Sequence, residues 1–359
     1  MTAKSKQAYR FIEKALEKGP SLTAGLNAKH TGDAVRDVLL FAATTQRTIE
    51  AAVTILKDRG KDTPSPDTVH RRLRETGAED LVQLFTPCLE TVFREAKRKR
   101  LLQSPKRVAI DIHEKPFYGE AEGTVRGRAR QGTTRFWAYI SLDIVQARCR
   151  YTLAALPLTD KKMAAGLVEA LLRYALRWIR ISMVLLDRFF YRSDVIRAIE
   201  GLGLDWLMAA RTSRRLRRMA EQARERGRPW FKYAMNPGKE SQTSFHVFTV
   251  PAEKGGGFHY FAVSREVRYL RHWAGVYRGR WGVETGYRVK KGFLVRTAVR
   301  CVYVRLYLFL LSVLLHDVWE LLGRGGVGIS AGLFRDRLVR LVLGELRVGV
   351  RGFPVDAPG

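Results

Sequence analysis

The order of apolar segments after residue 107 restricts the fold of this chain more than any other feature of the sequence. Here short strand-like segments alternate with amphipathic helical ones, with short polar connections between them. The predicted series is strand, strand, strand, helix, strand, helix and strand, over residues 107–113, 135–144, 149–158, 160–178, 181–186, 193–201 and 205–210. Such a series predicts an α/β domain built on a sheet of mixed direction.

Three adjacent strands followed by helix, strand, helix and strand is the order of a ribonuclease-H-like core. We therefore expect such a domain over residues 107–322, interrupted by a basic, β-rich insertion at about 211–264. The insertion begins with an arginine-rich stretch. Strand-like pieces follow at 230–234, 244–250 and 258–263, with a glycine turn at 255–257 between the last two.

Residues 1–100 carry apolar residues at helical spacing and no alternating strand pattern, which predicts an all-α domain. Ser65, Pro66 and Asp67 provide an N-cap, a first-turn proline and a first-turn acid for a short basic helix. A helix, a polar turn and a short basic helix form the outline of a helix-turn-helix unit. The candidate DNA-reading residues are Thr68, His70, Arg71, Arg72 and Arg74. A solvated surface helix has the same outline, so both interpretations remain open.

Two further segments mark predicted boundaries. Residues 94–107 form a basic run ending at a Ser-Pro pair, which indicates a linker that either contacts phosphate or is simply solvated. A glycine cluster at 323–328 separates a short C-terminal segment, 323–359.

The chain of 359 residues has 64 Lys and Arg against 35 Asp and Glu, a formal charge of +29. Such an excess attracts polyanions, and nucleic acid is the partner that best explains it, with an anionic membrane surface as the competitor. The apolar stretch 306–315 is too short to span a bilayer and suits a buried core helix. Three scattered cysteines and a polar N-terminus predict a reducing, cytoplasmic, nucleoid-associated location.

Two aspartates stand out because each lies in or directly after an apolar strand. Asp111 lies within the first predicted strand and Asp187 follows the fourth. These strands are neighbours in the expected fold, so both carboxylates should converge at one edge of the sheet. Burying a carboxylate is costly unless a cation compensates. That cation is either a metal ion or an arginine.

A third acid, Glu284, lies on a helix predicted over 273–291. Tyr277, Arg280, Glu284 and Lys291 form one stripe roughly 60° wide, at about 100° per residue. A stripe with a carboxylate, two cations and a phenol suits a surface that binds a metal and adjacent phosphates. Three carboxylates without a His or Cys ligand set favour Mg²⁺ or Mn²⁺. Two such ions about 4 Å apart can promote phosphodiester cleavage.

The spacing Y-(2)-R-(3)-E-(6)-K formed by Tyr277, Arg280, Glu284 and Lys291 resembles the YREK motif of IS4-type DDE transposases. Asp111 in VAIDIHEKPFYGE and Asp187 in VLLDRFFYRSD resemble the first and second carboxylates of that family, and the β insertion has a similar place. Asp-x-His at the first acid and the overall length are most similar to the archaeal ISH3-like subfamily. The resemblance covers about residues 107–320.

The resemblance implies a role for each matching residue. Asp111, Asp187 and Glu284 would be catalytic and bind two metal ions. Tyr277, Arg280 and Lys291 would contact phosphates of the terminal DNA. In relatives that form a hairpin intermediate, an aromatic residue of the insertion stacks on a flipped base, and Trp230 is the candidate here. His113 shares the strand face of Asp111, where we expect a hydrogen-bonded histidine rather than a ligand.

These observations predict a DNA transposase of an insertion sequence that binds terminal inverted repeats and target DNA. It would act as a homodimer on double-stranded DNA, with no membrane partner. A non-catalytic transposase relic and a ribonuclease-H-like nuclease without strand transfer remain the alternatives.

Overall fold

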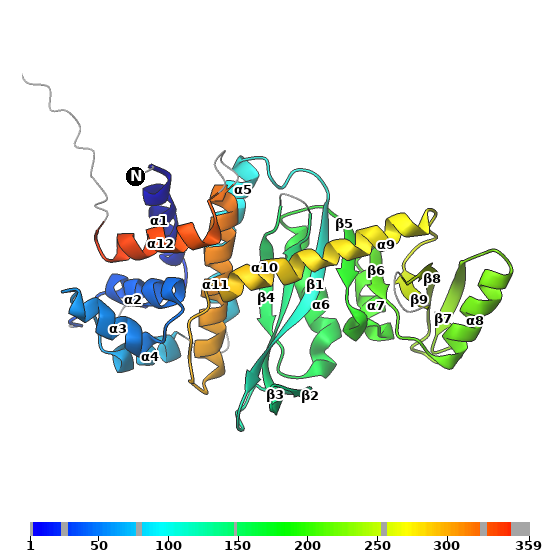
Figure 1. The fold of residues 1–359 in the computed structure, drawn as a ribbon, viewed down its shortest axis with the longest axis horizontal. Coiled ribbons are helices and arrows are strands. Elements are labelled where there is room, and N and C mark those ends of the chain that lie inside the picture. The colour runs from blue at the N-terminus through cyan, green and yellow to red at the C-terminus, as the bar shows by residue number, and fades with distance from the viewer. Residues whose placement is uncertain are drawn as a thin grey trace, which may run out of the picture. The chain divides into compact units, whose positions relative to one another are not determined.

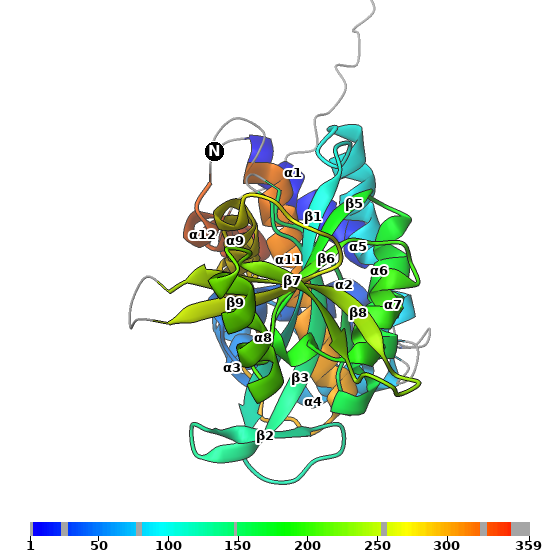
Figure 2. The same ribbon diagram turned by 90° about the vertical axis from the view of Figure 1, so that its right-hand side faces the viewer.

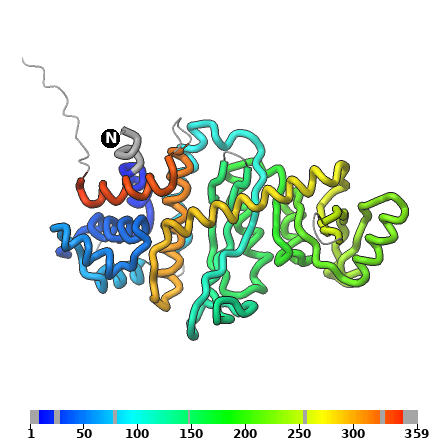
Figure 3. Tube along the Cα trace, in the orientation of Figure 1, coloured from blue at the N-terminus to red at the C-terminus, as the bar shows by residue number. Residues whose placement is uncertain are grey.

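The computed structural model describes residues 3–22, 28–76, 81–146, 149–252, 257–323 and 329–345, and Figure 3 traces the chain. It divides into two compact units. The first comprises Met1–Cys88, Lys290–Val299 and Tyr303–Gly359. The second comprises Leu89–Val289 and Arg300–Val302.

The first unit is helical, as the spacing of apolar residues predicted (Figure 1). Its helices are α1 (Ala3–Leu16), α2 (Gly32–Thr45), α3 (Ile49–Asp58), α4 (Pro66–Glu75), the start of α5 (Leu81–Arg98), most of α11 (Val302–Gly323) and α12 (Ala331–Val342). Contacts link α1 and α2 to α12, α2 to α3, and α3 to α4. Helix α4 begins as predicted, because the Ser65 hydroxyl accepts a hydrogen bond from Thr68 N and Pro66 is in the first turn.

Helix α11 is long and apolar enough to cross a membrane by length and composition alone, but 78% of its most apolar window is buried. Tyr307 on this helix packs edge-on against Phe85 of α5, with ring centroids 5.5 Å apart. A single buried apolar helix of this kind is typical of a protein core, which agrees with the prediction for residues 306–315.

The second unit is built on a sheet of nine strands in the order β2-β3-β1-β5-β6-β9-β8-β7, with β4 paired to β3. The strands are β1 (Lys106–Phe117), β2 (Val125–Arg130), β3 (Thr133–Ile144), β4 (Thr152–Pro157), β5 (Ile181–Leu186), β6 (Trp206–Ala209), β7 (Trp230–Met235), β8 (Thr243–Pro251) and β9 (Phe258–Val263). The pairs β1–β5 and β5–β6 are parallel and the others are antiparallel. The predicted mixed α/β sheet is therefore confirmed.

Helices cover both faces of this sheet. Helix α6 (Ala164–Leu176) packs on β3 and β4 and contacts α7 (Ser193–Glu200). The other face is covered by α9 (Leu270–Arg278) and α10 (Gly282–Lys291), whose Ala274 and Val283 join a core cluster with Ala109 of β1 (Figure 1). Strand alternation sends Ala109 toward that cluster and Ile112 toward α6.

Three features differ from the predicted elements. Strand β2 was not predicted, because its sequence is charged and it pairs only with β3. The arginine-rich start of the insertion forms a helix, α8 (Arg214–Glu225), whose buried Leu216 and Ala220 are one turn apart. The strands of the insertion also continue the main sheet through the β6–β9 pair, with α8 beside β7 (Figure 2).

The unit boundaries also differ from the expected domain boundaries. Most of α11 belongs to the helical unit rather than to the predicted 107–322 domain. The expected C-terminal segment contributes α12 to the same unit. Of the predicted glycine features, residues 255–256 and 324–328 lie outside the described residues.

Candidate active site

Asp111 and Asp187 lie side by side at one edge of the sheet. In the parallel pair β1–β5, Ile110 is opposite Leu186, and each aspartate is the next residue along its strand. Neighbouring strands are about 4.8 Å apart, so the two carboxyl groups leave adjacent backbone positions. The structure thus brings together two acids that are 76 positions apart in the sequence (187 − 111 = 76).

Each aspartate is partly compensated by local hydrogen bonds. Asp111 Oδ1 accepts a hydrogen bond of 3.0 Å from Ile112 N. Asp187 caps the 3₁₀ turn η2 (Arg188–Phe190), where its Oδ1 accepts a bond of 2.8 Å from Phe189 N. These bonds orient both carboxyl groups, that of Asp111 in the middle of β1 and that of Asp187 just after the end of β5.

The electrostatic environment disfavours ionisation of both aspartates. Burial raises the pKa of Asp111 from 3.8 to about 6; Arg280 opposes this shift, and Asp187 adds to it. Burial likewise raises the pKa of Asp187, against backbone hydrogen bonds and the charge of Arg280. Two half-buried carboxylates near one another are under-compensated, which is the situation that a bound cation relieves.

The charge of Arg280 acts on both aspartates. Its Nη1 lies 3.4 Å from Asp111 Oδ2, and its Nη2 lies 3.3 Å from Glu284 Oε1. The Arg280 side chain is 12% exposed, whereas that of Glu284 is 46% exposed. The guanidinium therefore links the first and third predicted acids.

The predicted helix over 273–291 is interrupted at this point. A 3₁₀ turn, η3 (Gly279–Trp281), separates α9 from α10 and contains Arg280. Tyr277 ends up half-buried on α9 with its ring 5.1 Å from that of Phe261, and burial raises the pKa of its phenol. Lys291 is the exposed last residue of α10 and belongs to the first unit, where its carbonyl accepts from Gln46.

A buried polar network, not found from the sequence, lies on the same face of the sheet. Ser141, the cross-strand partner of Asp111, donates to Asp143 Oδ2 over 2.6 Å. His113 Nε2 is 2.7 Å from Ser141 Oγ, and its ring stacks on Tyr287 of α10. His113 is therefore a hydrogen-bonded strand histidine, as expected. The sequence did contain a signal for Asp143. Side chains alternate between the two faces of the strand predicted at 135–144, which puts Asp143 on the same face as Ser141.

The donor set fits a hard divalent cation only in part. Asp111, Asp187 and Glu284 offer carboxylate oxygens alone, the donors preferred by Mg²⁺ and Mn²⁺. Yet the described residues contain no group of three or more His, Cys, Asp or Glu side chains placed to hold a metal ion. Two acids are adjacent, and the third is tied to Arg280.

Two predicted DNA-reading residues have structural roles instead. Arg72 is 3% exposed, and its guanidinium donates to the carbonyls of Leu22, Thr31 and His30. His70 is also buried, with Nε2 3.0 Å from Glu50 Oε1.

The other positions of the predicted reading helix remain accessible. Thr68 is half-buried, and Arg71 and Arg74 are exposed. The prediction of a reading role was therefore wrong for His70 and Arg72, because the face of α4 that bears them turns inward. It stays a prediction for the other three residues.

The tryptophan singled out in the insertion is poorly exposed. Trp230 is half-buried and packs against the core cluster that contains Phe248. By contrast, Trp281 is 62% exposed and directly follows Arg280, a feature that sequence reasoning missed. Trp281 lies within the predicted motif, between Arg280 and Glu284, so the motif itself could have drawn attention to it.

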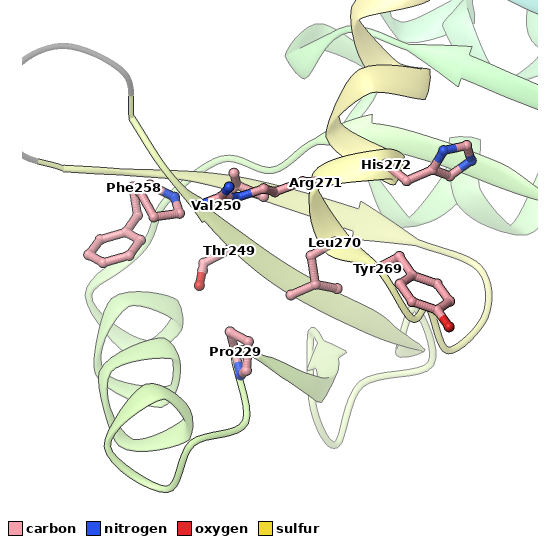
Figure 4. A pocket seen from close by; sticks show the side chains of 9 residues that line it. Pro229, Thr249, Val250, Phe258, Tyr269, Leu270, Arg271 and His272 are labelled. Carbon is pink, nitrogen blue, oxygen red and sulfur yellow. The ribbon is translucent and has the colours of Figure 1, made fainter.

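A separate cavity of about 520 Å³ lies at the insertion. Figure 4 shows its lining side chains, most of them apolar, with Phe258 at one end and Tyr269 and His272 at the other. None of the predicted site residues lines it.

Comparison with known proteins shows what the sequence and the fold of this chain are similar to. Residues 159–314 match the family model described as the transposase DDE domain. The chain is similar to a cryo-EM structure of a piggyBac transposase synaptic complex with hairpin DNA, at a TM-score of 0.59 and 12% identity. The similarity covers 93% of this chain and 76% of that one. No curated protein matches the chain.

The resemblance to DDE transposases that the motif indicated is thus confirmed, and the IS4-type assignment is consistent with it; the subfamily stays a prediction. Transposase DDE domains generally use divalent metal ions. Residues 159–314 of this chain therefore carry the sequence pattern of a transposase DDE domain, on a fold similar to that of a piggyBac transposase.

Proposed function

We propose that this chain is the DNA transposase of an insertion sequence. It binds the ends of its element and catalyses metal-dependent phosphodiester cleavage and strand transfer. The observation that carries the proposal is the adjacency of Asp111 and Asp187 at one sheet edge, with Glu284 linked to Asp111 through Arg280. The match to the transposase DDE domain and the transposase-like fold support it.

The residues that would hold metal are Asp111, Asp187 and Glu284, with Mg²⁺ or Mn²⁺ as the ions and two as their number. When bound, such ions activate the attacking oxygen and stabilise the leaving one in phosphodiester chemistry. Hydrogen bonds from Ile112 N and Phe189 N orient the two carboxyl groups, which preorganises this part of the site.

Basic and phenolic side chains of the motif would position the DNA. Arg280 presents a planar fork suited to two phosphate oxygens, and Lys291 a compact point charge. Tyr277 lies next to Arg280, whose guanidinium carbon is 5.9 Å from the phenol ring centroid. Tyr277 and Arg280 would bind the backbone beside the scissile bond and hold it against the acids, and Lys291 would contact a phosphate of the terminal DNA.

DNA is the partner that the charge of +29 supports, since neutralising phosphates with Lys and Arg releases counterions. The similar piggyBac structure is a synaptic complex with DNA, which agrees with this partner. We expect a homodimer on the element ends and a cytoplasmic, nucleoid-associated location. Thr68, Arg71 and Arg74 on α4 remain the candidates for reading the terminal repeat.

The test is cleavage of a duplex that carries the sequences flanking the reading frame, with Mg²⁺ present. Asp187→Asn should abolish nicking while leaving the affinity for the duplex unchanged. Asp160→Asn is the matched control, because exposed Asp160 caps the 3₁₀ turn η1 (Lys161–Met163) as Asp187 caps η2, with an equal bond of 2.8 Å to Lys162 N. Nicking at the wild-type rate by Asp187→Asn would falsify the proposal.

The same assay separates the alternatives. A transposase relic would bind the duplex and give no nicking in the wild-type protein. A nuclease of this fold would nick the duplex but fail to join a supplied 3′-hydroxyl end to a target. Joining that requires Asp111, Asp187 and Glu284 would support the transposase.

A further inference from the structure

Arg280 lies between the first and the third predicted acids, Asp111 and Glu284. One guanidinium nitrogen faces Asp111 Oδ2 and the other faces Glu284 Oε1, at 3.4 Å and 3.3 Å. Both contacts are longer than the 2.7–2.9 Å of a good charge-assisted hydrogen bond. The side chain is nonetheless only 12% exposed, so its charge lies largely out of solvent beside these acids.

The hydrogen bonding of Arg280 is also incomplete. Its Nε is buried and has no hydrogen-bond partner among the described residues. An unsatisfied buried donor is costly, and a guanidinium can donate two parallel, charge-assisted hydrogen bonds to one oxyanion. The present contacts therefore hold Arg280 without using its full donor capacity, and a phosphate offers it a better partner.

We propose that Arg280 couples phosphate binding to divalent-cation binding at this site. In the DNA-free chain its guanidinium stands between Asp111 and Glu284 as a substitute cation. When a DNA phosphate binds the guanidinium, the two carboxylates are released to join Asp187 as a set of three. The inference rests on the proposed function, because it assigns these acids to a metal site.

The coupling must be reciprocal. If phosphate raises the affinity for a divalent cation, the cation raises the affinity for DNA by the same factor. Removing the guanidinium should therefore abolish the coupling and, in the absence of DNA, strengthen cation binding. Such a device keeps the site from binding metal productively until a DNA end is present.

The experiment titrates the full chain with Mn²⁺ and follows free Mn²⁺ by electron paramagnetic resonance, in the absence of DNA. Arg280→Gln should bind Mn²⁺ about tenfold more tightly than the wild type, within the range usual for coupled sites. Arg288→Gln is the control, since exposed Arg288 follows Glu284 by four residues as Arg280 precedes it by four. It removes the same charge from the other side of Glu284 along the chain and should change the affinity far less.

The second measurement is the affinity for a duplex oligonucleotide with and without Mn²⁺, by fluorescence anisotropy. Mn²⁺ should tighten binding by the wild type and by Arg288→Gln, and leave Arg280→Gln unaffected. Arg280→Lys retains the charge but lacks the planar fork of donors that faces both carboxylates, so it should give an intermediate Mn²⁺ affinity. Circular dichroism and thermal unfolding check that each variant is folded.

The outcomes separate this inference from the proposed function. Equal Mn²⁺ affinities for Arg280→Gln and Arg288→Gln, in a protein whose Mn²⁺ binding is lost in Asp187→Asn, overturn the coupling and leave the metal site intact. Mn²⁺ binding that is absent, or indifferent to Asp187→Asn, overturns both. Tighter binding by Arg280→Gln that requires Asp187 supports both.

Discussion

Arg280 donates to Asp111 across 169 positions of sequence, from the turn between α9 and α10 to the middle of β1. This contact ties the helix that bears Glu284 to the strand that bears the first acid. It also explains how a half-buried carboxylate is tolerated, because a cation accompanies it.

The pH dependence of stability should reveal Asp111. Its pKa is raised on folding from 3.8 to about 6, so the folded chain holds the proton more tightly and loses stability as the pH rises through this window. At neutral pH the cost is at most about 3 kcal/mol. Asp111→Asn removes it, and should stabilise the metal-free protein at pH 7.5 but not at pH 4 in thermal unfolding.

Asp58→Asn serves as the control for this effect, because Asp58 is exposed at the end of α3. Its melting temperature should follow that of the wild type at both pH values. A difference between Asp111→Asn and the wild type that is equal at pH 4 and pH 7.5 would contradict the assignment.

Arg72 and Arg71 should separate stability from DNA binding in α4. Arg72→Leu leaves three carbonyls without their shared donor and should destabilise the helical unit by about 3 kcal/mol. Arg71→Gln breaks only an exposed pair with Glu75 and should leave stability unchanged while weakening binding to the element end. Denaturant unfolding and anisotropy measure the two effects. Unchanged stability in Arg72→Leu would reject its structural role.

Trp281 and Trp230 offer a second matched pair. Trp281 is exposed beside Arg280, so Trp281→Ala should lower the affinity for a DNA end with unpaired bases about tenfold and leave the melting temperature nearly unchanged. Trp230→Ala removes packing against the core and should lower the melting temperature instead. The opposite pattern would restore Trp230 as the stacking residue.

Salt should weaken DNA binding steeply. With a charge of +29, many Lys and Arg neutralise phosphates on binding, so the affinity should fall by about a thousandfold between 50 and 200 mM salt. The slope of log affinity against log salt, measured with a random duplex, checks this expectation. A flat slope would exclude phosphate neutralisation as the main source of affinity.

The sequence by itself determined the elements and the candidate acids, because hydrophobic periodicity is local. Strand β5 was predicted at its observed bounds, and the Ser-Pro start of α4 was recognised from its cap. The motif residues Tyr277, Arg280 and Glu284 were found from their spacing, which a helix imposes on neighbouring residues. Strand β2 and helix α8 were missed, since charged sequences carry little apolar signal.

Only the tertiary structure decided which side chains meet and which are free. It turned Arg72 and His70 inward, exposed Trp281 rather than Trp230, and built the Ser141–Asp143 network behind Asp111. It also placed the Arg280 guanidinium in contact with both Asp111 and Glu284. Burial and the pairing of charges depend on residues far apart in the chain, and a local pattern names the residues of a site without fixing their partners.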